Sequence, residues 1–98
     1  MNNGYSPSIL SNDKACFICG TTFNLHRHEV FGASNRNRSK RQGCWCYLCA
    51  PHHNLGNHAV HNDREEELKL KRLCERRWLD IYDKTEEDFI SEYGRSYL

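Results

Sequence analysis

The strongest periodic pattern of hydrophobic residues lies in the C-terminal third of the chain. Asp63 followed by Glu66 is a helix-capping pattern, so a helix is predicted to start after Asp63. A second capping pair, Thr85 and Asp88, predicts a short helix that Gly94 would end. Within the first helix, apolar residues recur at the spacing of one helical face: Leu70, Leu73, Cys74, Trp78, Ile81 and Tyr82.

The middle of the chain has the pattern of a β-hairpin. Residues 24–31 and the segment "CWCYLC" (44–49) are rich in aromatic, β-branched and other apolar residues and are predicted to form its two strands. The intervening segment 32–43 is bounded by glycines and has no apolar period, so it is predicted to be a loop. Pro51 then allows the chain to turn into a helix or helical turn that carries histidines. The pattern predicts an α+β fold, with a hairpin and helix followed by a helical extension.

Composition changes this picture in one respect, because the chain has little material for a core. Its 98 residues suit one domain over residues 15–98, with a hairpin core over 15–62, helices over 63–98, and a flexible arm over 1–14. Only 38% of the residues are hydrophobic and the mean hydropathy is -0.87. A chain this small and polar usually needs disulfides or a metal as a staple. Its six cysteines are interleaved with histidines, which favours metal binding.

The N-terminal segment and the hydropathy profile indicate in which cellular compartment the protein is expected. The segment "MNNGYSPSIL" has no basic start and no long apolar run, so it is not typical of a signal peptide. No apolar stretch approaches the length of a membrane span. We therefore expect a cytoplasmic protein with reduced thiols and no membrane partner.

Two ligand pairs predict a structural zinc site. Cys16 and Cys19 form one C-x-x-C pair, and the second pair is either Cys49 with His52 or Cys46 with Cys49. A zinc knuckle needs a turn between its ligands, which "AP" provides after Cys49, whereas "YL" before it is better strand material. We favour Cys16, Cys19, Cys49 and His52.

Further histidines predict a second metal site that is open to solvent. Three of them follow the zinc turn, namely His53, His58 and His61, and two lie on the first predicted strand, namely His26 and His28. They are too many for one closed tetrahedral site. Beside them, the segment from Val30 to Asn62 contains no acidic residue, and a basic cluster within it is expected to contact phosphates of DNA: Arg36, Arg38, Lys40 and Arg41.

These motifs together resemble a known enzyme family. The stretches "CFICG", "LHRHEVFG", "YLCAPHHN" and "VH", from Cys16 to about His61, resemble the HNH endonuclease superfamily and, more narrowly, small phage-type HNH proteins. The resemblance implies a zinc-stapled ββα-metal (treble-clef-like) hairpin and helix. It also implies a metal-dependent endonuclease that hydrolyses phosphodiester bonds in DNA with one divalent cation, Mg²⁺, Mn²⁺, Ni²⁺ or Zn²⁺.

The resemblance assigns roles to individual residues. His28, His53 and His61 would hold the catalytic cation. If "HE" stands for the family's paired histidines, His28 is a ligand and Glu29 occupies the position of the general base. If the motif has a single histidine, His28 is the base, and Arg27 or Glu29 is an anchor.

The chain departs from the family pattern at the middle asparagine. The asparagine of HNH sites is expected near the second strand, where position 44 is a cysteine. Asn35 or Asn37 would have to replace it from the preceding segment.

The resemblance also implies a setting for the protein. It would act in the cytoplasm of a bacterial host, with DNA as its partner, alone or as a homodimer, and a phage packaging or recombination protein could direct it. The alternative is a non-catalytic treble-clef zinc module that binds nucleic acid or a phage protein. A purely structural zinc protein would leave the histidines of the first strand unexplained.

Overall fold

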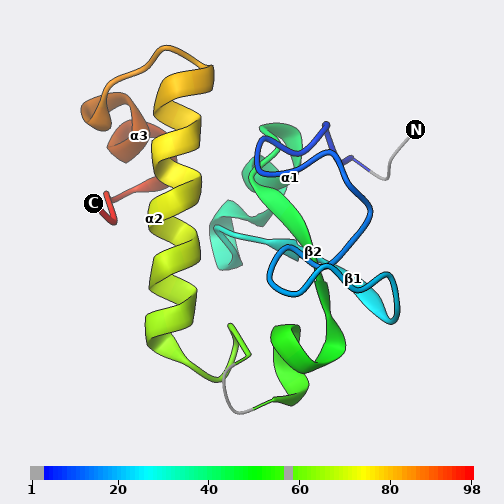
Figure 1. The fold of residues 1–98 in the computed structure, drawn as a ribbon. Helices are drawn as coiled ribbons and strands as arrows, with labels where there is room; N and C mark the ends of the chain where they lie inside the picture. Colours follow the sequence, from blue (N-terminus) through cyan, green and yellow to red (C-terminus); the bar gives the residue numbers. More distant parts are fainter. Residues whose placement is uncertain (1–3, 57–58) are drawn as a thin grey trace.

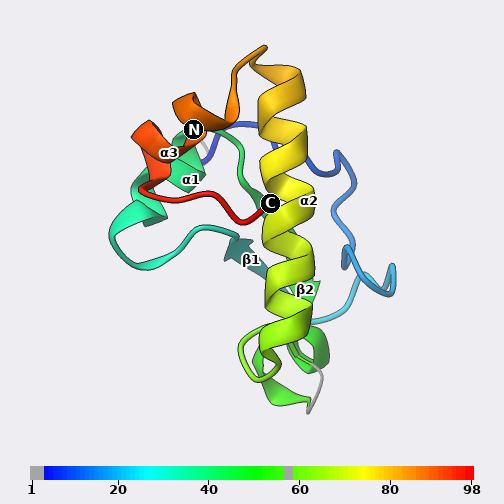
Figure 2. The same ribbon diagram turned by 90° about the vertical axis from the view of Figure 1, so that its left-hand side faces the viewer.

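A two-stranded antiparallel hairpin lies beside one long helix, and the two together position the remaining segments (Figures 1 and 2). The computed structural model describes residues 4–56 and 59–98. In chain order the elements are β1 (Leu25–Glu29), a 3₁₀ turn (Ala33–Asn35), α1 (Arg36–Arg41), β2 (Trp45–Cys49), a π-helical turn (Pro51–Leu55), α2 (Arg64–Ile81) and α3 (Glu86–Tyr93). The predicted α+β class and its antiparallel hairpin are confirmed.

The register of the hairpin decides which side chains share a face. His28 lies opposite Cys46, and Arg27 lies opposite Tyr47. Because successive strand residues point to opposite faces, His26 and His28 share one face and Arg27 lies on the other. The histidine face adjoins the buried core, since His28 is only 6% exposed.

The segment between the strands is helical, so the predicted loop over residues 32–43 was wrong. Helix α1 has only six residues and buries a single side chain, Ser39. The Ser39 hydroxyl donates to the Phe31 carbonyl at 2.8 Å and accepts from the Phe31 amide at 3.1 Å. A helix held by one buried hydroxyl leaves no apolar period in the sequence, which is why hydropathy did not predict it.

The N-terminal segment also differs from the predicted mobile arm. The Ser6 amide donates to the Lys40 carbonyl at 2.8 Å and the Ile9 amide to the Gly43 carbonyl at 2.9 Å. Leu10 is buried. Gly43 has φ +74°, and a Cβ there would collide with the Pro7 carbonyl, so this docking requires glycine. Residues 6–10 thus pack on α1 and the hairpin, while residues 1–3 of the predicted arm lie outside the described residues.

Helix α2 begins where its capping residue predicts. The Asp63 side chain accepts hydrogen bonds from the amides of Glu65 and Glu66, at 3.0 and 3.4 Å. Of the predicted stripe, Leu70, Cys74 and Trp78 are buried, whereas the last members, Ile81 and Tyr82, are 50% and 39% exposed. Among residues 4–56 and 59–98, no helix is long and apolar enough to cross a membrane.

Helix α3 returns the chain to the hairpin and closes an aromatic core. The predicted capping box of Thr85 and Asp88 is present, and Gly94 ends the helix at φ +90°. Phe89 packs edge-on against Trp78 at 5.3 Å and against Phe31 at 5.1 Å between ring centroids. The core therefore joins the segment directly after β1 to α2 and α3.

A buried carboxylate ties the C-terminal segment to α2. Glu75 is fully buried, and it accepts from the Ser96 hydroxyl and the Tyr97 amide, both at 2.6 Å. The Tyr97 ring stacks on Phe31 at 5.6 Å. Glu75 thereby fixes the chain end beside the hairpin.

We expect Glu75→Ala to lower the free energy of unfolding by about 2 kcal/mol, because it leaves the half-buried Tyr97 amide without its acceptor, while the Ser96 hydroxyl keeps only its bond to Glu86. Urea unfolding followed by circular dichroism measures this. The matched control on the same helix is Glu66→Ala, which removes only an exposed ion pair with Lys69 and should cost less than about 1 kcal/mol. Equal losses in the two variants would contradict the assigned role of Glu75.

Candidate metal centres

Four predicted zinc ligands come together at one end of the hairpin. The ligand atoms of Cys16, Cys19, Cys49 and His52 all lie within 4.8 Å of one another and could hold a metal ion. The Sγ atoms of Cys19 and Cys49 are 3.7 Å apart, and Nδ1 of His52 lies 3.2 Å from Cys49 Sγ and 3.7 Å from Cys16 Sγ. The predicted grouping of these four side chains is confirmed.

Local backbone structure brings the two pairs together. The Gly20 amide donates to the Cys16 carbonyl at 2.8 Å, which closes the turn of the C-x-x-C pair. The Phe17 amide donates to the Tyr47 carbonyl at 2.8 Å and docks this turn on β2. Cys49 ends β2, and His52 lies in the π-helical turn that Pro51 begins.

Cys46, the alternative ligand, is not a member of this cluster. Residues three apart on a strand point to opposite faces, so Cys46 and Cys49 cannot both face the Cys16 turn. Burial raises the pKa of Cys46 to about 12, which keeps it a neutral thiol.

The electrostatics of the four-residue cluster favour a cation. Burial opposes ionisation of Cys16, but hydrogen bonds from the backbone at Cys49, Cys19 and Ile18, and from His52, lower its pKa to about 6. Burial and the neighbouring thiols raise the pKa of Cys49, so a second negative charge is disfavoured until a cation is present. The thiolate is the metal-binding form of cysteine.

A second cluster contains three histidines. The ligand atoms of His28, His53 and His61 lie within 4.8 Å of one another. Nε2 of His53 is 2.9 Å from Nε2 of His61, and the His28 ring lies 5.3 and 5.2 Å from those two rings, centroid to centroid. The structure thus brings together the three histidines to which the HNH resemblance assigned a cation.

Three different segments position these histidines. His28 is on β1 and His53 is in the π-helical turn, while His61 lies in the turn before α2. The Val60 amide donates to the His52 carbonyl at 2.9 Å, and the His61 amide donates to the His53 carbonyl at 3.2 Å, so the second turn folds back on the first. His58 lies outside the described residues.

The three-histidine cluster is arranged to offer neutral ligands. Burial, followed by the proximity of His53 and His61, lowers the pKa of His28 to about 3. Burial and the neighbouring His61 and His26 also lower the pKa of His53. A neutral imidazole has a free lone pair at neutral pH, which is the form that binds metals.

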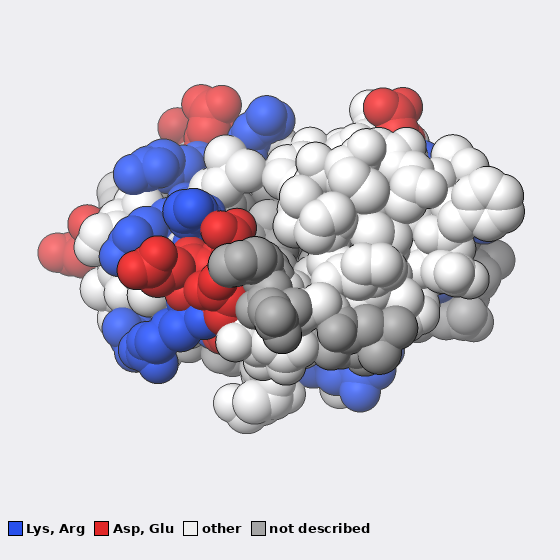
Figure 3. All heavy atoms as spheres, turned by 60° about the horizontal axis from the view of Figure 1, so that its bottom comes forward, with Lys and Arg blue, Asp and Glu red and all other residues white. Residues whose placement is uncertain are grey.

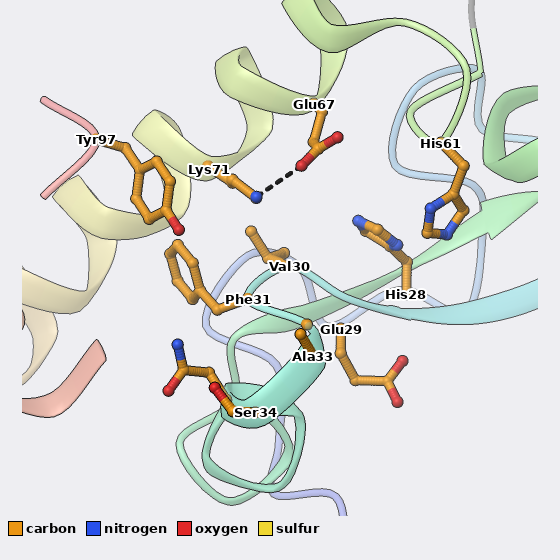
Figure 4. Close-up of a pocket in the computed structure, with 12 residues that line it drawn as sticks. His28, Glu29, Val30, Phe31, Ala33, Ser34, His61, Glu67, Lys71 and Tyr97 are labelled. Atoms are coloured by element: carbon orange, nitrogen blue, oxygen red, sulfur yellow. Dashed lines mark ion pairs between the residues drawn. The ribbon is translucent and has the colours of Figure 1, made fainter. Parts of the chain in front are cut away.

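Space for a ligand adjoins this cluster on two sides. One cavity of about 340 Å³ is lined by all three histidines together with Arg27 and Arg36. The other, of about 330 Å³, adjoins His28 and His61 and reaches Lys71 and Tyr97 (Figure 4). His61 is exposed, so the cluster can be reached from solvent, unlike a closed structural site.

Glu29, the candidate general base, is held by an arginine. Its carboxylate lies 2.6 Å from Nε of Arg36. Burial alone would raise the pKa of Glu29, but the hydrogen bonds from Arg36 and Tyr5 outweigh it and lower the pKa. Figure 4 shows the Glu29 side chain turned away from the pair formed by His28 and His61.

Asn35, one candidate for the missing middle asparagine, is engaged elsewhere. Its amide nitrogen donates to the Tyr93 carbonyl at 3.0 Å, and its oxygen accepts from Arg38 at 3.1 Å. These bonds direct the side chain to α3. The other candidate, Asn37, is exposed on α1.

The predicted phosphate-binding residues of α1 differ in the contacts that their side chains make in the structure. Arg36 is paired with Glu29, and Arg38 contacts both the Glu92 carboxylate, at 3.0 Å, and the Glu92 carbonyl. Lys40 lies over the Tyr5 ring at 5.0 Å, whereas Arg41 is exposed. In Figure 3 acidic and basic side chains are intermixed on the side that carries α2, with no continuous basic patch in that view.

Under the predicted DNA-binding role of α1, Arg41→Ala is expected to weaken DNA binding and to reduce the slope of log affinity against log salt by about 1, as loss of one phosphate contact does. Arg38→Ala is expected instead to lower the free energy of unfolding by about 1 kcal/mol, because it removes hydrogen bonds to α3. Fluorescence anisotropy of a labelled duplex over a salt series, alongside urea unfolding, measures both. A larger change of salt slope for Arg38→Ala than for Arg41→Ala would contradict this division.

Sequence reasoning counted His26 among the histidines of the second metal site without assigning it a specific role, and it named Arg27 only as a possible anchor. Arg27 lines the cavity beside the histidines and lies over the Tyr5 ring at 4.7 Å. His26 lies 3.0 Å from His53, nitrogen to nitrogen. Strand alternation could have placed His26 on the face of His28, but the contact with His53 depends on a turn that starts more than twenty residues later.

No protein-family model matches this chain, and neither a curated protein nor a solved structure matches it.

Proposed function

We propose that this chain is a metal-dependent HNH-type endonuclease that hydrolyses phosphodiester bonds in DNA. The observation that carries the proposal is the pair of separate ligand clusters on one hairpin. One cluster is rich in cysteine, and the other is an all-histidine group beside two cavities. A closed cysteine-rich site and an open histidine site are typical of a structural metal and a catalytic metal respectively.

Zinc is the proposed occupant of the cluster formed by Cys16, Cys19, Cys49 and His52. A tetrahedral zinc ion, with Zn–S distances of about 2.3 Å and Zn–N distances of about 2.0–2.1 Å, separates two sulfur ligands by about 3.8 Å and a sulfur from a nitrogen by about 3.6 Å. The observed separations are 3.7 Å between sulfurs and 3.7 and 3.2 Å between sulfur and nitrogen. Three thiolates and one imidazole form a donor set typical of structural zinc.

A divalent cation is the proposed occupant of the cluster formed by His28, His53 and His61. When bound there, it would lower the pKa of a water ligand and offset the charge that develops on the scissile phosphate. Three neutral imidazoles leave coordination positions for phosphate and water, and the adjoining cavities provide room for them. This assignment makes His28 a ligand.

Arg36 is proposed to bind the phosphate of the substrate, and Glu29 is proposed to accept the proton of the attacking water. Arg36 lines the cavity beside the histidines, and a phosphate that binds there competes with Glu29 for its guanidinium. Loss of that partner raises the pKa of Glu29 toward its ordinary value and makes the carboxylate a better acceptor for the proton of the attacking water. The pair would then couple phosphate binding to the release of a base.

The ββα-metal architecture is part of this proposal. Strands β1 and β2 precede the π-helical turn and α2 in the order that the architecture requires, and β1 contributes the first histidine of the open cluster. The third element is interrupted, because His53 and His61 lie in two turns and not on one continuous helix.

A second candidate function is a non-catalytic treble-clef zinc module that binds nucleic acid or a phage protein. Two observations favour it: the carboxylate of Glu29 is occupied by Arg36, and the side chain of Asn35 is occupied by Tyr93 and Arg38. Neither residue is free to activate or orient a base in this arrangement. The nuclease is preferred because the module does not explain the convergence of three histidines.

Incubation of the zinc-loaded protein with supercoiled plasmid tests the proposal. We expect nicked or linear DNA when Mg²⁺, Mn²⁺, Ni²⁺ or excess Zn²⁺ is added, and intact plasmid without added cation, because the cysteine-bound zinc has no open position. Arg41→Ala serves as the control for DNA binding, since it should slow cleavage only at limiting protein. An intact plasmid with every cation, together with a gel shift of the same DNA, would replace the nuclease with the binding module.

A further inference from the structure

We propose that His26 is a positioning residue of the three-histidine centre. It accepts a hydrogen bond from Nδ1 of His53 and thereby holds the His53 ring in the orientation and tautomer that present Nε2 to the cation. This inference rests on the proposed function, since it requires that the histidine cluster binds a cation.

The two ring nitrogens of His53 have different neighbours. Nε2 lies 2.9 Å from Nε2 of His61, within the proposed cation site. Nδ1 lies 3.0 Å from Nδ1 of His26. The His26 and His53 rings meet edge to face, at 5.1 Å and 82°. His53 is therefore held between a proposed ligand on one edge and His26 on the other.

The proton count fixes the direction of this hydrogen bond. A neutral imidazole carries one N–H, and coordination uses the lone pair of the other nitrogen. If Nε2 of His53 binds the cation, its proton is on Nδ1, and Nδ1 is the donor. Nδ1 of His26 is then the acceptor, and the proton of His26 is on its own Nε2.

Such a bond has two effects on a metal ligand. It fixes the ring against rotation about its side-chain bonds, and it raises the basicity of the coordinating nitrogen. Carboxylates and backbone carbonyls usually accept this bond in metal sites. Here the hairpin supplies an imidazole, because His26 is two residues before His28 on β1 and shares its face.

His26 acts through His53 and not as a fourth ligand. The cluster whose ligand atoms lie within 4.8 Å of one another contains His28, His53 and His61 but not His26. The nearest nitrogen of His26 lies against Nδ1 of His53, which is not the nitrogen that faces His61. An ion at the three-histidine site would therefore meet His53 and not His26.

Calorimetric titration of Co²⁺ into protein that already holds one zinc at the cysteines measures the effect. His26→Ala is expected to weaken binding of this second cation by about 10-fold to 100-fold, the range for loss of a hydrogen-bond partner behind a metal ligand. His26→Asn retains an acceptor oxygen and should recover most of the affinity. His26→Phe retains a ring but has no acceptor, so it should behave like His26→Ala. Full affinity in His26→Phe would reduce the role to packing and overturn the proposal.

Nitrogen-15 NMR of the protein loaded with zinc at both sites provides a readout that a packing role would not move. We expect Nδ1 of His53 to be protonated in the wild type, and its proton to exchange faster with water in His26→Ala. A metal-bound Nδ1 in His53, or a metal-bound nitrogen in His26, would overturn the proposal.

The titration also separates this inference from the proposed function. If the wild-type protein binds no second cation, both the proposed function and the role of His26 are overturned. A wild-type protein and a His26→Ala variant that bind the second cation equally well leave the proposed function intact and overturn only the role of His26.

Discussion

Cys16→Ser is expected to abolish tight binding of the proposed zinc ion and to unfold the end of the hairpin that carries the cysteines. The thiolate is the stronger ligand, and serine at neutral pH offers only a hydroxyl. Binding of structural zinc supplies apparent free energies of about 10–16 kcal/mol in small zinc domains, which exceeds the total stability of most domains of this size. Removal of the zinc with a chelator should therefore have the same effect as the substitution.

Circular dichroism and the zinc content of the purified protein measure this outcome. The matched control is Cys46→Ala, which removes a buried thiol from β2 that is not in the cluster. It should keep one bound zinc and lose on the order of 1 kcal/mol for the small cavity. A folded Cys16→Ser protein without zinc would show that the hairpin does not depend on the metal.

The cysteine-rich cluster could be predicted from the sequence because metal coordination constrains the spacing of its ligands. Cys16 and Cys19 are joined by a tight turn, and the Pro51 turn brings His52 close to Cys49. Each pair is local, so only the meeting of the two pairs depended on the fold. The choice of His52 over Cys46 also followed from the local sequence, since "AP" allows a turn between two ligands and "YL" favours a strand.

Helix α1 and the docked N-terminal segment could not be predicted, because polar groups hold them in place. Ser39 anchors α1 through its hydroxyl, and Ser6 and Ile9 anchor the N-terminal segment through backbone amides. Hydropathy patterns report the burial of apolar side chains and are insensitive to such bonds. Both segments therefore resembled loops in the sequence.

The ion pairs of the candidate site residues also could not be predicted from the sequence. A run of basic residues without nearby acids suggested a phosphate-binding loop, yet Arg36 and Arg38 find carboxylates on β1 and α3. These pairs join residues that are 7 and 54 positions apart. Charge patterning along the chain cannot reveal them, because they depend on how α1 packs between its neighbours.

Under the proposed function, His28→Ala is expected to abolish metal-dependent cleavage of plasmid DNA while it leaves the fold around the cysteine-rich cluster intact. The substitution removes one of three proposed ligands of the catalytic cation. Loss of metal-based stabilisation of several kcal/mol, taken as about 4 kcal/mol, corresponds to about a 10³-fold lower rate. His28 is separate from the Cys16 cluster, so the content of tightly bound zinc should stay at one per chain.

The fold and the reaction are measured on the same preparations. Cys46→Ala again provides the matched control, because Cys46 lies directly opposite His28 on β2 and is also buried. It should retain cleavage, whereas His28→Ala should retain the circular dichroism spectrum and lose binding of the second cation in calorimetry. If His28→Ala lost its structure to the same extent as Cys16→Ser, the histidines would belong to the structural site, and two independent metal centres would no longer describe this protein.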